Sequence, residues 1–139
     1  YYAQLVWGLY DTIGMCDFVG EPINTLTLNR LVEALAAVTG WPLSLFEVVK
    51  ASERANNMKR VFNVREGFTA ADDTLPDRMF EPLENGALEG ECLDRESFAH
   101  MLQLYYEMAG WDPRSGFPLP AKLAELDLSW LEAERPAAE

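Results

Sequence analysis

The hexapeptide 11–16 (DTIGMC) holds the residues best suited to chemistry: a carboxylate, Asp11, and a thiol, Cys16, on either side of Gly14. On an unbroken helix, five residues at about 100° each would leave the two side chains roughly 140° apart. Gly14 lets the chain leave helical geometry, so that both can turn toward one bound group. A carboxylate accepts hydrogen bonds from ring N–H donors, and a thiolate is the ligand of iron–sulfur centres. The simpler alternative is that Gly14 only ends a helix and Cys16 is a small buried apolar residue.

Other polar residues have weaker claims to chemistry. His100 lies beside the apolar positions of a predicted helix with no partner motif, so we interpret it as a structural or surface residue. Cys92 occupies a turn rich in Gly and Glu, and we interpret it as an incidental exposed thiol. Two cysteines this far apart form neither a disulfide framework nor a CxxC zinc motif.

Several arginines could bind an anion, but neighbouring carboxylates favour a structural interpretation. The arginines are Arg54, Arg60, Arg65 and Arg78, and the carboxylates are Glu53, Glu66, Asp72, Asp73 and Asp77. A guanidinium group makes bidentate contacts to a carboxylate. We therefore expect ion pairs that hold a long loop in place, with loss of stability when Arg60 or Arg65 is replaced by alanine.

The elements that must position these residues are predicted to be helices. Apolar spacing and capping residues predict helices over 2–13, over 28–38, from 45 to a stop at Gly67, from the N-cap Asp94 to Gly110, and over 120–126. Residues 67–93 are predicted to form a long ordered loop of the kind that often binds or covers a ligand. The predicted fold class is all-α, an irregular bundle of about four to six helices. The helical domain would span 1–131, and 132–139 would be a disordered tail.

The same spacing predicts which residues are buried. In the fourth helix the expected buried stripe consists of Phe98, Met101, Leu102, Tyr105 and Met108. The tryptophans at 41, 111 and 130 are expected in the core or in packing between domains. The middle of the third helix, residues 53–60, is polar on every side, which places it in solvent or against a polar partner.

Composition excludes some functions. The 139 residues carry a net charge of −12 with scattered Lys and Arg, so there is no basic face for nucleic acid or for an anionic membrane surface. No apolar run is long enough to cross a bilayer, and no secretory signal is visible, so a cytoplasmic protein with reduced cysteines is expected. The chain begins as if inside a helix with no initiator methionine, which favours a segment of a longer protein; processing would look the same.

Several segments together resemble the carboxy-terminal end of the tungsten-containing aldehyde:ferredoxin oxidoreductase family. They are 11–16 (DTIGMC), 38–41 (VTGW), 53–54 (ER), 60–67 (RVFNVREG), 72–78 (DDTLPDR), 105–106 (YY), 110–112 (GWD) and 123–128. Each is weak alone, but their order and spacing cover nearly the whole chain, from residue 1 to about 131.

The resemblance implies a function. Members of the family oxidise aldehydes to carboxylic acids with tungsten held by two pterins, and electrons leave through a [4Fe–4S] cluster to ferredoxin. By position in the motif, Asp11 would hydrogen-bond a pterin, Cys16 would be one ligand of the cluster, and the backbone of Met15 would also contact a pterin. The other cluster cysteines, the amino-terminal domain and the histidine and glutamate near tungsten lie upstream in the family, so the partners implied are those upstream domains and ferredoxin.

Two cysteines cannot supply the about four thiolates of a [4Fe–4S] cluster, so we expect the isolated chain to be inactive and to hold neither cluster nor tungsten. An exposed apolar patch is expected where other domains would pack, and this could also favour a homodimer. The alternatives are a free-standing helical interaction module without redox chemistry, or part of a related family member such as an aromatic acyl-CoA reductase subunit. The sequence does not distinguish tungsten from molybdenum.

Overall fold

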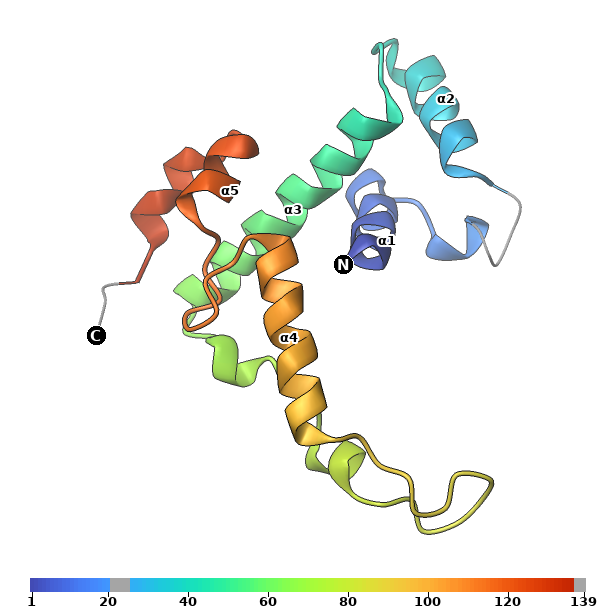
Figure 1. The fold of residues 1–139 in the computed structure, drawn as a ribbon. Helices are drawn as coiled ribbons and strands as arrows, with labels where there is room; N and C mark the ends of the chain where they lie inside the picture. The colour runs from blue at the N-terminus through green and yellow to red at the C-terminus, as the bar shows by residue number, and fades with distance from the viewer. Residues whose placement is uncertain (21–25, 137–139) are drawn as a thin grey trace.

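The computed structural model describes residues 1–20 and 26–136, and this part of the chain is all-α, as predicted (Figure 1). Its helical segments in chain order are α1 (Tyr2–Ile13), η1 (Asp17–Val19), α2 (Leu28–Thr39), α3 (Leu45–Arg65), η2 (Ala70–Asp72), η3 (Asp77–Phe80), α4 (Arg95–Ala109), α5 (Pro120–Glu125) and η4 (Ser129–Glu134). Across the described ranges there is no strand, and backbone pairing outside the helices is limited to isolated bridges.

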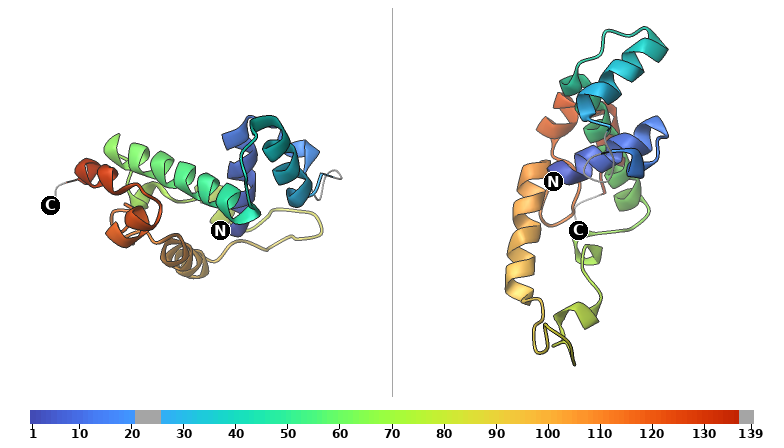
Figure 2. Two further views of the ribbon diagram at one scale, coloured as in Figure 1. Left: turned by 90° about the horizontal axis from the view of Figure 1, so that it is seen from above. Right: turned by 90° about the vertical axis from the view of Figure 1, so that its right-hand side faces the viewer.

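The long helix α3 is the central strut of the fold. Ser44 and Glu47 start it with the predicted capping box, in which Glu47 N–H donates to Ser44 Oγ at 3.2 Å and Ser44 N–H donates to the Glu47 carboxylate at 2.8 Å. Helices α1 and α2 lie toward the amino-terminal half of α3, whereas α5 and η4 lie on its other side (Figures 1 and 2). Helix α3 therefore lies between these two groups of helices.

Helix α1 packs closely against α3 because a glycine lies at the contact. An added Cβ on Gly8 would come within 2.9 Å of Ser52 Oγ, closer than real side chains approach. The buried Ser52 hydroxyl donates to the Leu5 carbonyl at 2.7 Å, which ties the two helices together. This contact fixes the direction in which the carboxyl end of α1, and with it the hexapeptide, leaves the body of the protein.

The apolar interior is divided into three small clusters along α3. One joins α3 to α5 and η4 around Phe117 and Leu123, and another joins α1 and α2 to α3 around Leu9 and Leu31. The third, around Tyr106, joins the end of α4 to the following turn. No single core spans the described residues, which explains the elongated shape in Figure 2.

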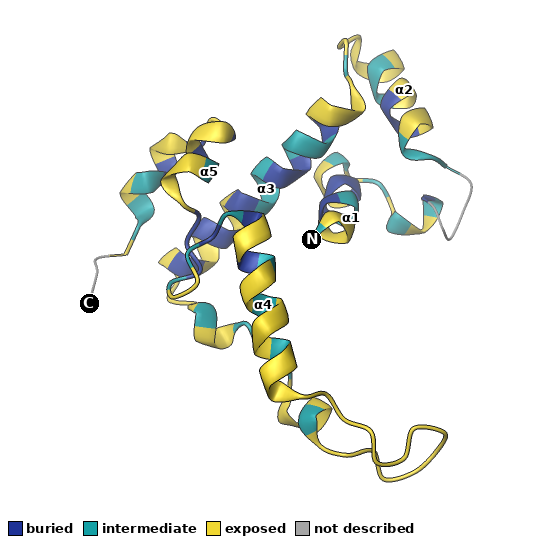
Figure 3. Cartoon of the chain, in the orientation of Figure 1, coloured by how far each residue is buried: buried dark blue, intermediate teal, exposed yellow. Residues whose placement is uncertain are grey.

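The predicted buried stripe of α4 is only partly right, since Phe98, Leu102 and Tyr105 are half-buried and the two methionines are exposed. Met101 and Met108 are 57% and 52% exposed, and the buried residues of this helix are instead Tyr106 and Ala109. The helix meets the rest of the molecule near its carboxyl end and is otherwise exposed (Figure 3). Helical spacing identified an apolar face correctly, but this chain provides little to cover it. Of the three tryptophans, only Trp111 is buried; Trp41 and Trp130 are exposed.

Residues 67–93 form an ordered arm that extends away from α3 and α4 (Figure 1). The arm contains η2 and η3, and it is braced internally by backbone hydrogen bonds from Leu83 to Glu91 and from Leu93 to Met79, both 3.0 Å. At the carboxyl end, η4 continues to Glu134, and the Arg135 guanidinium lies 4.3 Å from the centre of the Phe117 ring. The end of η4 thus falls within the predicted tail, 132–139, of which residues 137–139 lie outside the described part.

Helix α3 is long, but it is polar. No helix in the described part of the chain is both long and apolar enough to span a membrane.

Candidate functional site

Gly14 ends α1 in a left-handed turn. Its φ is +70°, the Gly14 N–H donates to the Asp11 carbonyl at 3.2 Å, and the Met15 N–H donates to the Tyr10 carbonyl at 2.9 Å. This pair of bonds is the Schellman motif, which favours glycine because a Cβ is strained at positive φ. The prediction that Gly14 takes the chain out of helical geometry is confirmed.

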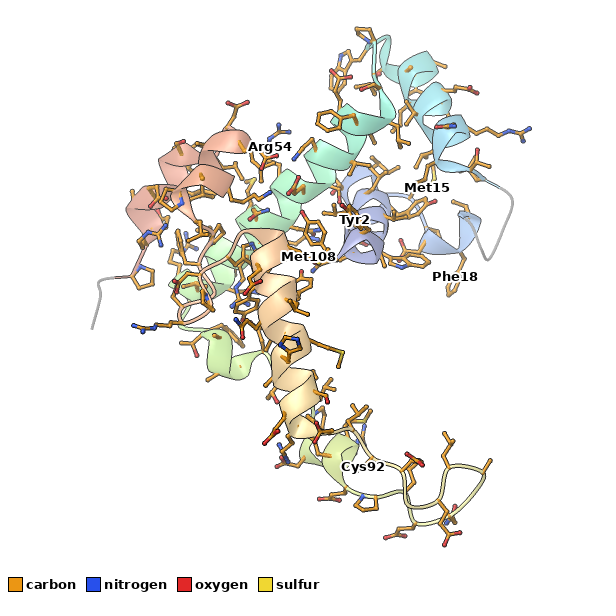
Figure 4. All side chains as sticks on the ribbon, in the orientation of Figure 1. Tyr2, Met15, Phe18, Arg54, Cys92 and Met108 are labelled. Atoms are coloured by element: carbon orange, nitrogen blue, oxygen red, sulfur yellow. The ribbon has the colours of Figure 1, made fainter. Side chains whose placement is uncertain are left out.

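The turn separates the three predicted site residues by exposure. Asp11 and Cys16 are exposed, whereas the Met15 side chain is half-buried and packs against the cluster around Leu9. Figure 4 shows Met15 on this turn, with Phe18 beyond it on η1. The carboxylate and the thiol are therefore both accessible from solvent. The alternative that Cys16 is a buried apolar residue is wrong.

Asp17, which sequence reasoning overlooked, adds a second carboxylate at this turn. Its Oδ1 atom is buried and has no hydrogen-bond partner among the described residues. A buried acceptor without a donor is costly, so such an atom is suited to a donor supplied by a bound group. No sequence signal beyond its position next to Cys16 points to this residue.

By their chemistry these residues are suited to a pterin and an iron–sulfur cluster. Asp11 and Asp17 are acceptors suited to ring N–H donors, and Cys16 is a suitable iron ligand. A [4Fe–4S] cluster takes about four thiolates, and Cys16 would be one of them. Within residues 1–20 and 26–136 no group of three or more His, Cys, Asp or Glu is arranged to hold a metal ion.

Lys59 connects the hexapeptide to α3. Its ammonium nitrogen lies 3.7 Å from the Asp11 carboxylate, and both side chains are more than half exposed. Lys59 also lines a pocket of about 520 Å³ between α3, α4 and the start of the arm. Lys59 therefore lies both in this pocket and beside Asp11, the residue predicted to contact a pterin.

The polar middle of α3 is buried against partners from distant parts of the chain. Glu53 is 3% exposed and contacts Lys122 at 2.8 Å, Lys50 at 2.6 Å and the Tyr1 hydroxyl at 2.7 Å. Burial alone would raise the pKa of the Glu53 carboxyl, but these hydrogen bonds lower it to about 2. Glu53 is thus a buried anion held by two lysines, and it takes no part in holding the long loop, the role expected of the arginine–carboxylate pairs.

Arg60 is the residue that holds the arm, as predicted. Its guanidinium contacts the Asp73 carboxylate at 2.7 Å, donates to the Gly116 carbonyl at 2.8 Å and lies 4.9 Å from the centre of the Trp111 ring. The Tyr106 hydroxyl donates to the same Asp73 carboxylate, and burial together with this bond raises the pKa of Tyr106 to about 12. One buried cation therefore joins α3, the arm, α4 and the turn after α4.

The remaining candidate residues do not converge on a site. Arg54 donates to the Leu126 carbonyl at 2.8 Å, and Arg65 pairs with its neighbour Glu66 at 3.0 Å, so neither holds the arm. His100 and Cys92 are exposed, in agreement with the interpretation made from the sequence. Asp77 of the arm pairs with Arg95, the first residue of α4, at 2.8 Å.

The chain is similar to known proteins over most of its length. Residues 1–128 match the family described as "Aldehyde ferredoxin oxidoreductase, domains 2 & 3". The chain is 32% identical over 128 residues to the tungsten-containing aldehyde ferredoxin oxidoreductase of Pyrococcus furiosus, a match covering 91% of this chain and 20% of that protein. It is 28% identical over 141 residues to the aliphatic sulfonate oxidoreductase, WOR-like subunit, of the same organism, covering 97% of the chain and 22% of that protein.

A solved structure shares the fold. The chain superposes with a TM-score of 0.75 on part of the active-site complex BamBC of benzoyl-coenzyme A reductase with 1,5-dienoyl-CoA, covering 94% of this chain and 18% of the other at 22% identity. The chain spans about a fifth of the length of the curated relatives that it matches.

Proposed function

Because the chain belongs to the aldehyde ferredoxin oxidoreductase family, as its motifs indicated, we propose that it contributes one edge of the cofactor site in a tungstopterin enzyme that oxidises aldehydes to carboxylic acids. Ferredoxin is the proposed electron acceptor, and the cytoplasm the proposed location. The observation that carries the proposal is the turn after α1, where Gly14 leaves Asp11 and Cys16 exposed on either side of a packed Met15.

Each residue of this turn has a proposed role. The Asp11 carboxylate accepts a hydrogen bond from a pterin N–H, and Cys16 is one thiolate ligand of a [4Fe–4S] cluster. Because the Met15 side chain packs inward, Met15 offers the pterin its backbone. When bound, the tungstopterin and the cluster supply the redox chemistry; the residues of this chain bind and orient them.

The rest of the site belongs to partners outside this chain. We propose that upstream domains of the same enzyme provide the other cluster cysteines and cover part of the exposed apolar surface, including Met101 and Met108 of α4. The isolated chain would then be inactive and hold neither cluster nor tungsten. In the isolated chain, where those domains are missing, we propose that the same surface favours a homodimer.

We prefer aldehyde oxidation to the activities of the related enzymes because of the sequence identities. The aldehyde enzyme of Pyrococcus furiosus is more similar to the chain, at 32% identity, than the sulfonate oxidoreductase subunit, at 28%. The likeness to the benzoyl-coenzyme A reductase complex is one of fold. A free-standing interaction module remains the alternative from another class, and the experiment below decides between them.

The two exposed cysteines allow a matched test in the whole enzyme that carries this segment. Cys16→Ser should remove or destabilise the cluster, seen as loss of iron and of the iron–sulfur absorbance and electron paramagnetic resonance signals. Cys92→Ser, at a position equally exposed but on the arm, should leave them unchanged. Equal cluster content in both variants would refute the role of Cys16, whereas absence of iron from the unmodified whole protein would favour the interaction module.

A further inference from the structure

The pocket beside Lys59 has two halves of different chemistry. It lies where four parts of the chain meet, and its volume of about 520 Å³ is within the range of small-molecule sites. Phe98, Leu102 and Tyr105 of α4 provide an apolar wall, and Lys59 of α3 provides an ammonium group at the side of Asp11. This pocket is suited to a ligand with an apolar body and a polar end.

Lys59 is the lining cation available to such a ligand. Arg60 is engaged by Asp73 at 2.7 Å and by the Gly116 carbonyl, and it is buried. Asp72 is engaged in capping η2, where it accepts from the Thr69 N–H at 2.7 Å. Lys59, by contrast, has among the described residues only the long 3.7 Å contact to Asp11, and its side chain is 60% exposed. Arg60 and Asp73 neutralise each other, and the Asp72 carboxylate is held by the Thr69 N–H and hydroxyl, so Lys59 is the lining cation that the polar end of a ligand can reach.

We propose that this pocket binds a small organic carboxylate, with its carboxylate on Lys59 and its apolar body against Phe98 and Leu102. The inference rests on the proposed function, since oxidation of an aldehyde leaves a carboxylate. Lys59 places that oxygen-bearing end toward Asp11, the proposed cofactor edge, and the apolar end away from it. Lys59 is then a specificity-determining residue, and Asp11 competes with the ligand for its ammonium group.

Benzoate, titrated into the 139-residue chain and followed by amide nuclear magnetic resonance shifts, tests the proposal without any cofactor. Benzoate should bind, with shifts in α3 and α4 around the pocket, and the uncharged isostere benzamide should bind about tenfold more weakly or worse because it lacks the charge-assisted bond. Inorganic phosphate, which has no apolar body, should also bind more weakly than benzoate.

Variants make the result specific. Lys59→Gln should weaken benzoate binding about tenfold, whereas Arg30→Gln, which removes an exposed cation on α2, should not change it. Asp11→Asn should tighten benzoate binding, because it frees Lys59. Absence of saturable benzoate binding in the millimolar range, equal binding of benzamide, or insensitivity to Lys59→Gln would each overturn the proposal. None of these outcomes depends on a cluster or pterin, so failure here is distinguishable from failure of the cofactor role of Cys16.

Discussion

Replacement of Arg60 by alanine should release the arm, and Arg65→Ala is its matched control. Both arginines lie on α3 near its carboxyl end, but Arg60 is 6% exposed and joins the arm through Asp73, whereas Arg65 is exposed and pairs with its neighbour Glu66. The sequence predicted that either substitution would loosen the arm. The structure assigns the effect to Arg60 alone.

The magnitude follows from what Arg60→Ala leaves behind. Removal of one partner of a buried ion pair costs about 3–5 kcal/mol. Because the Asp73 side chain is 32% exposed and can regain water, the lower end applies, about 3 kcal/mol, with the lost Trp111 ring contact included in it. Arg65→Ala removes an exposed pair and should cost about 0–1 kcal/mol.

Chemical denaturation and amide hydrogen exchange measure the two effects separately. Arg60→Ala should lower the free energy of unfolding by about 3 kcal/mol and speed exchange in η2, whose amides of Asp72 and Asp73 are bonded within the turn. Arg65→Ala should leave that exchange unchanged. If the two variants unfold with free energies within about 1 kcal/mol of each other and protect η2 equally, the account of the arm is wrong.

Three further outcomes are expected. The pKa of Glu53 is lowered from 4.5 to about 2, so its ionised carboxylate contributes no more than about 3 kcal/mol to the free energy of unfolding. This contribution is present above pH 4.5 and is lost as the pH falls toward 2. Glu53→Gln should therefore flatten this part of the pH–stability curve measured by denaturation. Gly14→Ala and Gly40→Ala, both at positive φ with open space around a new Cβ, should each cost about 1 kcal/mol in thermal unfolding, but only Gly14→Ala should lower cluster content in the whole enzyme. Met108→Gln should leave the stability of the isolated chain within about 0.5 kcal/mol, because the side chain is 52% exposed; a larger loss in urea unfolding would contradict the placement of α4.

The helices could be predicted from the sequence because their ends depend on local chemistry. The Ser44–Glu47 capping box, the Asp94 N-cap and the Gly40 and Gly110 stops each act within a few residues, and the structure has α3, α4 and α2 where those signals placed them. The same holds for Gly14, whose turn depends on bonds to the carbonyls of Asp11 and Tyr10, three and four positions before it.

What the sequence could not provide was the set of contacts made over long separations. Glu53 is paired with Lys122, 69 residues away, instead of the adjacent Arg54, and no local pattern encodes that choice. The apolar face of α4 shows the converse limit. Periodicity identifies an apolar face, but whether that face is covered depends on what packs against it, and here Tyr106 is buried while Met101 and Met108 stay exposed.

A structure of the whole enzyme with its cofactors bound measures the central claim most directly, because it shows what the thiol of Cys16 touches. We predict continuous density from the Cys16 sulfur to an iron of a [4Fe–4S] cluster, with the Asp11 carboxylate within hydrogen-bonding distance of a pterin nitrogen. A complete cluster with four other ligands, and Cys16 apart from it, would contradict the account.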